Sequence, residues 1–141
     1  MGSGVRKRVY AAVVAGLLTA TPMSFAAEIL CGMDEVPLFS CALENGQLFS
    51  LCGKNTELWF WYGASRAAGF AFAVGSGEND ELLDYEHDTG YQTDFFRLTF
   101  LHEGYEYEVY RDHDGLSGPE TDAGIRVMEP GSGKSEAYRC K

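Results

Sequence analysis

The segment 105–110 reads Tyr-Glu-Tyr-Glu-Val-Tyr, and this strict alternation limits the possible folds more than any other feature of the chain. Successive side chains of a β-strand point to opposite faces, so the alternation predicts a strand with one apolar face. The segment 96–100 alternates in the same way, and Gly104 between the two can adopt the positive φ of a tight turn. We therefore predict a β-hairpin over residues 94–112.

Six further segments are short, rich in aromatic and β-branched residues, and bounded by turns that contain glycine. They are residues 35–41, 47–52, 57–62, 68–74, 124–128 and 135–140. With the hairpin they amount to about eight strands, and consecutive hairpins favour an antiparallel meander. We predict an all-β fold, a small antiparallel meander barrel or sandwich.

Two polar stretches interrupt this pattern. Residues 75–92 contain six carboxylates, and residues 112–123 are polar and rich in turn formers. We predict both as surface loops, where a binding function would reside.

The first residues have the three regions of a secretory signal peptide. Three cations at residues 6–8 precede an apolar stretch at 9–19, which is too short to span a bilayer, and Ser24-Phe25-Ala26 follows. Cleavage after Ala26 leaves residues 27–141 as a single β-rich domain, which we expect to be periplasmic or secreted. The alternative is a buried N-terminal helix.

All four cysteines lie after the predicted cleavage site, and an even number in a small exported domain indicates disulfides. The sequence contains no Cys-x-x-Cys pair, the spacing that would favour a zinc site. Three pairings are possible. We favour Cys41–Cys140, which would tie an early strand to the last one, with Cys31–Cys52 as the second pair. The alternative joins Cys41 to Cys52 on adjacent strands.

The predicted mature domain is acidic. It keeps eight of the eleven basic residues and all 21 acidic ones, a net charge of −13. Nucleic acid is then a poor partner, because phosphate binding needs clustered cations. Such a field would steer a basic protein toward the domain, or it merely keeps the domain soluble.

The segment Asp112-x-Asp114-Gly115, followed by Glu120 and Asp122, is similar to part of a calcium-binding loop. It lacks the third acidic ligand before glycine and the glutamate at the twelfth position. The alternative is an ordinary Asp-Gly turn, which we favour.

His87 and His113 each stand beside carboxylates, as a metal ligand would, but a solvated loop histidine is the simpler interpretation. Ser65 lacks the Gly-x-Ser-x-Gly pattern of a nucleophile elbow. We therefore expect no enzymatic activity, no metal and no cofactor.

The consecutive aromatic residues 59–62 place rings on both faces of a strand. One face would be an exposed interaction surface unless a loop covers it. We favour a cover supplied by residues 75–92.

Four features together resemble a known family. They are Phe-Ser-Cys at residues 39–41, Asn-Gly at 45–46, Leu-Phe-Ser-Leu at 48–51, and Cys140. The arrangement resembles the periplasmic and membrane-bound inhibitors of C-type lysozyme, which are small exported β-barrels. The resemblance implies a terminal cysteine that closes the barrel onto its first strand.

In that family a Ser-Gly segment followed by Ala-Arg-Tyr enters the lysozyme cleft. Here Gly-Ser-Gly at residues 75–77 is followed by Glu-Asn-Asp at 78–80; the Arg-Tyr pair and the family's later Lys-Gly motif are missing. Of the family's binding residues the resemblance carries over Ser76 alone, and we add Glu78 and Asp80 of the same segment as candidate binding residues. It implies an exported acidic binding protein that inhibits a basic bacteriolytic hydrolase such as lysozyme. The alternative is a structural or envelope-associated β-domain without inhibitory or catalytic activity.

Overall fold

The computed structural model describes residues 29–78, 80–118 and 121–141, so the predicted signal peptide lies outside the described residues. The first sheet contains β1 (Val36–Ala42), β2 (Leu48–Lys54), β3 (Glu57–Gly63) and β4 (Phe70–Ala73). The second contains β5 (Leu82–Gly90), β6 (Thr93–His102), β7 (Tyr105–Asp114), β8 (Thr121–Met128) and β9 (Ser135–Arg139). None of the described residues forms a helix that could cross a membrane.

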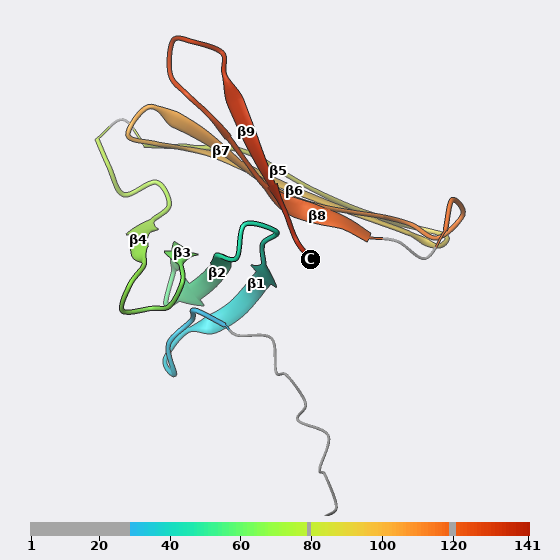
Figure 1. Cartoon of the computed structure of the whole chain (residues 1–141), viewed down its shortest axis with the longest axis horizontal. Helices are drawn as coiled ribbons and strands as arrows, with labels where there is room; N and C mark the ends of the chain where they lie inside the picture. The colour runs from blue at the N-terminus through green and yellow to red at the C-terminus, as the bar shows by residue number, and fades with distance from the viewer. Residues whose placement is uncertain (1–28, 79, 119–120) are drawn as a thin grey trace, which may run out of the picture.

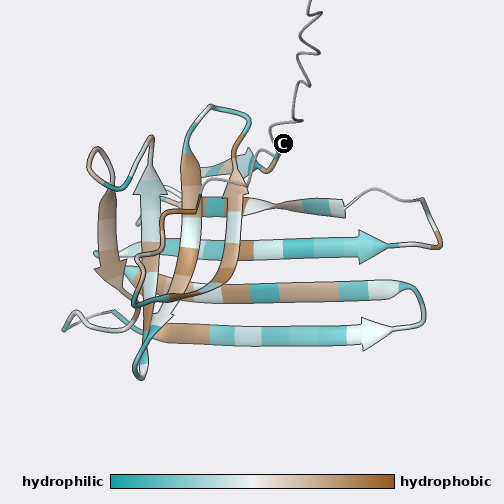
Figure 2. Cartoon of the chain, turned by 90° about the horizontal axis from the view of Figure 1, so that it is seen from below, coloured by the Kyte–Doolittle hydropathy of each residue, from teal (hydrophilic) through white to brown (hydrophobic). Residues whose placement is uncertain are grey.

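Each sheet is an antiparallel meander in which every strand pairs with the next one along the chain. Figure 2 shows the strands of the first sheet crossing those of the second, which extends well beyond it. In the described part of the chain the two sheets are joined by an isolated bridge between Leu43 and Cys140 rather than by a continuous strand ladder. The predicted all-β antiparallel fold is confirmed in its sandwich form, and the barrel alternative is wrong.

The predicted hairpin is present as β6 and β7, with Leu98 opposite Val109 and His102 opposite Tyr105. Glu103 and Gly104 form the turn with φ values of 51° and 82°. Two successive positive φ angles match the right-handed twist of the flanking strands, which explains why a glycine is needed there. The six shorter predicted strands each overlap an observed strand.

The predicted loop at residues 75–92 is wrong over half its length, because β5 occupies residues 82–90. All nine residues of β5 are exposed, so the strand has no buried face that an apolar sequence pattern could indicate. Asp84, Glu86 and Asp88 nevertheless stand at alternate positions, and edge strands often carry charges that prevent aggregation. The second predicted loop is also too long, because β7 runs to Asp114 and β8 begins at Thr121.

The core lies between the sheets and is largely aromatic. Phe49 and Phe60 from the first sheet and Phe100 from the second are all 0% exposed. The ring centroids of Phe60 and Phe100 are 5.8 Å apart with an edge-to-face arrangement, which suits the quadrupoles of the two rings. Burying each phenylalanine contributes about 1.5–3 kcal/mol of hydrophobic stabilisation.

Two disulfides link Cys31 to Cys52 and Cys41 to Cys140, the pairs that the sequence favoured. The second joins β1 to the residue after β9, so it ties the two sheets together at the Leu43–Cys140 bridge. Two disulfides in a domain of this size are typical of an oxidising compartment outside the cytoplasm.

Candidate functional site

The loop of residues 74–81 carries the chain from the first sheet to the second, as Figure 1 shows between β4 and β5. Both of its ends are fixed to strands. The Val74 amide donates a 2.7 Å hydrogen bond to the Leu58 carbonyl, and the Leu101 amide donates a 2.8 Å bond to the Glu81 carbonyl. The loop is therefore held between β3 and β6.

Asp80 anchors the base of this loop, and its side chain is only 7% exposed. Its Oδ1 accepts a 2.9 Å bond from the Glu103 amide, and its Oδ2 lies 2.7 Å from His102 Nδ1. The Glu103 amide is the main reason why the pKa of Asp80 lies below its ordinary value, and the bond from His102 adds to this. The carboxylate is thus occupied inside the protein.

The imidazole that holds Asp80 is itself fixed by packing. The His102 ring stacks on Phe72 with centroids 3.6 Å apart and an interplanar angle of 3°. Phe72 belongs to the core, so the anchor of the loop is continuous with the packing between the sheets.

The other two predicted binding residues are at the exposed tip of the loop. Ser76 donates a 2.7 Å hydrogen bond from Oγ to the Ala73 carbonyl and turns the chain away from β4. Glu78 is exposed. The structure therefore separates the three predicted residues into an anchor, Asp80, and two exposed positions, Ser76 and Glu78.

Other carboxylates gather around the loop. Glu57, Glu81 and Glu103 are exposed like Glu78, and all four lie in the loop, at the start of β3 or in the turn hydrogen-bonded to the loop. The segments 55–58, 74–82 and 102–105 contain no lysine or arginine, and Lys54, which stands opposite Glu57 in the β2–β3 ladder, is paired with Asp34. We call this region, Glu57, Glu78, Glu81 and Glu103 with the loop, the acidic end.

The aromatic residues 59–62 are divided between two faces of β3. Phe60 points into the core, whereas Trp59 and Trp61 lie on the outer face opposite Cys52 and Ser50 of β2. The cover predicted from residues 75–92 is supplied instead by residues 29–35 and by Arg66, whose guanidinium carbon lies 3.9 Å from the Trp61 ring centroid.

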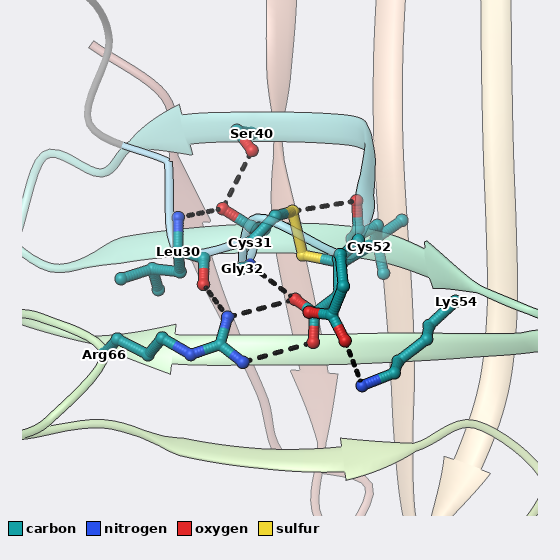
Figure 3. Close-up of polar contacts among 11 residues, drawn as sticks. Leu30, Cys31, Gly32, Ser40, Cys52, Lys54 and Arg66 are labelled. Atoms are coloured by element: carbon teal, nitrogen blue, oxygen red, sulfur yellow. Dashed lines mark hydrogen bonds and ion pairs between the residues drawn. A yellow bond between two sulfur atoms is a disulfide. The ribbon is translucent and has the colours of Figure 1, made fainter.

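Figure 3 shows how the segment 29–35 is held on this outer face. Leu30 donates a 3.0 Å bond from its amide to Ser50 Oγ, and the Cys31–Cys52 disulfide follows directly. Glu35, with a side chain 4% exposed, accepts a 2.7 Å bond from the Gly32 amide and bonds of 3.0 and 3.2 Å from the two terminal nitrogens of Arg66.

These contacts with Arg66 lower the pKa of Glu35, despite the opposing effect of burial. Cys31, Glu35 and Cys52 have the spacing of a metal-binding group, the one such cluster among the described residues. The two sulfurs are bonded to each other, however, and cannot act as thiolate ligands. The cluster is a structural clamp.

The remaining candidates take part in local contacts. Asp112 and Asp122 accept bonds from Arg97 and Arg139, and Asp114 caps an Asp-Gly turn by accepting a 3.0 Å bond from the Leu116 amide. This is the ordinary turn that the sequence favoured over a calcium loop. Glu120 lies outside the described residues.

The two histidines and the serine are similarly engaged. His87 lies 3.1 Å from Asp94, His113 lies 3.0 Å from Thr121, and Ser65 Oγ accepts a 3.1 Å bond from the Ala68 amide. His87 and His113 lie within β5 and β7, although the sequence placed both in loops.

Sequence reasoning missed one feature, a cavity of about 410 Å³ between the sheets. Its aromatic lining consists of Phe60, Tyr62, Phe70, Tyr105, Tyr107 and Tyr138. The shared face of Tyr105 and Tyr107 was visible in the alternation of β7. Their meeting with Tyr62 and Tyr138 depends on the packing of the two sheets, which no local pattern reveals. We call this cavity the aromatic groove.

No protein-family model, curated protein or solved structure matches the chain, so its function must be inferred from these sites.

Proposed function

We propose that this chain is an exported acidic binding protein that inhibits a basic bacteriolytic hydrolase such as lysozyme, with the acidic end as its contact surface. The observation that supports this proposal is the contrast within one loop. Asp80 fixes the base, while the tip with Ser76 and Glu78 is exposed.

A fixed loop suits an inhibitor because ordering a mobile segment on binding costs free energy. In this protein the hydrogen bonds of Val74, Asp80 and Leu101 hold the two ends of the loop on β3, β6 and the β6–β7 turn, so these ends need no ordering on binding. More of the interaction energy is then left for affinity.

The charge distribution suits a basic partner. Complementary fields accelerate association and favour one class of partner over others. The four glutamates of the acidic end add a local negative field to an overall net charge of −10, or −13 after the predicted cleavage. The rim of a hydrolase cleft lined with lysine and arginine would complement this surface.

Two matched triple variants test the contact surface. In Glu78→Gln/Glu81→Gln/Glu103→Gln the acidic end loses three charges, and in Asp84→Asn/Glu86→Gln/Asp88→Asn the edge strand β5 loses the same number. We expect the association rate with lysozyme to fall at least about tenfold in the first variant and far less in the second. Equal losses in both would show that only net charge matters and would remove the acidic end from the proposal.

The alternative is a structural or envelope-associated β-domain without inhibitory activity. It requires no binding to any lysozyme, and the exposed carboxylates would then serve solubility.

A further inference from the structure

The aromatic groove lies between β3 and β4 of the first sheet and β7, β8 and β9 of the second, strands that Figure 1 shows in the two layers. Phe60 and Ile125, 0% and 1% exposed, form its floor. Phe70 and Tyr105 are 51% and 39% exposed at its rim. The groove is therefore open to solvent at one side and closed by the core at the other.

The aromatic rings that line the groove pack against one another. The Tyr62 centroid lies 5.6 Å from that of Phe70 and 6.4 Å from that of Tyr138, and Phe60 and Tyr107 meet edge to face at 5.4 Å. Asn45 further fixes Tyr62 by donating a 2.9 Å hydrogen bond to its hydroxyl oxygen. Such fixed aromatic groups offer π faces without the entropic cost of ordering them on binding.

Charged groups line the same cavity: Glu129, Glu136 and Lys134 from the β8–β9 hairpin and β9. Glu136 stands opposite Val127, which stands opposite Tyr107, so all three lie on the inward face of the sheet. Two carboxylates against one ammonium leave the lining net negative.

The tyrosines add no charge of their own. Tyr138 donates a hydrogen bond from its hydroxyl to Glu136, which raises the pKa of Tyr138 to about 12, and burial raises the pKa of Tyr107. Both phenols are therefore neutral at physiological pH, and their rings retain the negative π faces that attract cations.

A cavity of about 410 Å³ lies within the range for small ligands. Several aromatic rings with nearby carboxylates are the chemistry that recognises alkylated ammonium groups, because methyl groups pack on the rings while the positive charge is attracted to them. An anion would be repelled by Glu129 and Glu136, and a purely apolar ligand would gain nothing from the charge of these two carboxylates.

We propose that the aromatic groove binds a small organic cation with an N-alkylated ammonium group. Tyr62, Tyr105 and Tyr138 contact the methyl groups, and Glu136 supplies the opposite charge. Lys134 weakens the binding of a simple cation by repulsion. This proposal does not depend on the inhibition of a hydrolase.

The test compares choline with dimethylbutanol, its neutral carbon isostere, by NMR titration of the exported, oxidised protein. We expect choline to shift the signals of residues lining the groove and the isostere to bind at least about fivefold more weakly. Equal affinity of the two would show an apolar cleft. The proposal is also overturned if choline does not bind, or if only a neutral saccharide such as N-acetylglucosamine does.

Three variants locate the site. Tyr105→Ala and Glu136→Gln change exposed groups of the groove and should each weaken choline binding by about threefold or more. Lys134→Gln should strengthen it. Tyr91→Ala, at a tyrosine that is 81% exposed and does not line the groove, is the matched control and should change nothing. Unchanged affinity in Tyr105→Ala and Glu136→Gln, with native far-UV circular dichroism, would place the cation elsewhere and overturn the proposal.

Discussion

Asp80 and His102 join the loop between the sheets to the end of β6, with 2.7 Å between Asp80 Oδ2 and His102 Nδ1. The same carboxylate accepts the amide of Glu103, the first residue of the β6–β7 turn. One side chain thus fixes two connections that are far apart in sequence, and it orders the surface on which the proposed function depends.

Replacing Asp80 should loosen this loop without unfolding the sandwich. In Asp80→Ala the Glu103 amide loses its acceptor, so we expect its hydrogen exchange to accelerate at least about tenfold. Amides in the centre of β6, such as that of Leu98, should keep their protection. Unchanged hydrogen exchange at Glu103 in Asp80→Ala would contradict the anchoring role. Asp88→Ala, on the exposed strand β5, is the control and should leave this exchange unchanged.

The same anchor predicts a pH dependence of the loop. The pKa of Asp80 is lowered from 3.8 in the folded protein, chiefly by the Glu103 amide. A lowered carboxyl pKa contributes stability that is fully present above the unfolded value and is lost as the pH falls through the folded value. We therefore expect exchange at Glu103 to be insensitive to this group above about pH 5 and the protection to fall below pH 3.8.

Asp80→Asn supplies the comparison for this experiment, since it cannot titrate. If the wild type and Asp80→Asn respond identically to acid, another group controls the loop.

The two disulfides should differ in their contribution to stability. Cys41–Cys140 spans 99 residues and Cys31–Cys52 spans 21. The chain-entropy treatment therefore gives a stabilisation of the folded state of about 4–5 kcal/mol for the first disulfide and about 3 kcal/mol for the second. Urea unfolding of the two double-serine variants measures this difference. A greater loss on removing Cys31–Cys52 would show that the clamp on the outer face matters more than closure of the long loop.

The Glu35–Arg66 pair should stabilise the covered face of the first sheet. Arg66→Ala leaves a carboxylate with a 4% exposed side chain without its guanidinium, and we expect the free energy of unfolding to fall by about 1–3 kcal/mol. This range allows for the 43% exposure of the Arg66 side chain, which water screens. Urea unfolding measures it.

Lys54→Ala is the matched control, because it removes a cation whose ion pair with Asp34 is exposed. It should leave stability nearly unchanged. Equal effects of the two variants would argue against a specific role of the buried carboxylate.

Local sequence patterns predicted most of the strands but fewer of the contacts between them. The hairpin of β6 and β7 followed from alternation and Gly104, which act within about ten residues. The sequence does not reveal strand β5, because its charges are typical of a loop, although an edge strand gains its stability from backbone pairing and tolerates exposed charges.

The candidate site was predictable only in part. The acidic loop is visible in the sequence, but the burial of Asp80 depends on His102, 22 residues away. Likewise Tyr62, Tyr105 and Tyr138 meet only when two separate meanders pack together, and the cover over Trp61 comes from Arg66 and a segment before β1.

The central claim is that the acidic end binds and inhibits a basic bacteriolytic hydrolase. The most direct measurement adds the exported, oxidised protein to C-type, G-type and I-type lysozymes at low salt and follows cell-wall lysis. We expect inhibition of at least one type. Between about 0.01 and 0.15 M salt the screening length falls from about 30 to about 8 Å, so the association rate should fall more than the dissociation rate rises. Absence of binding and inhibition with all three types at low salt would contradict the proposal and leave the structural, envelope-associated domain.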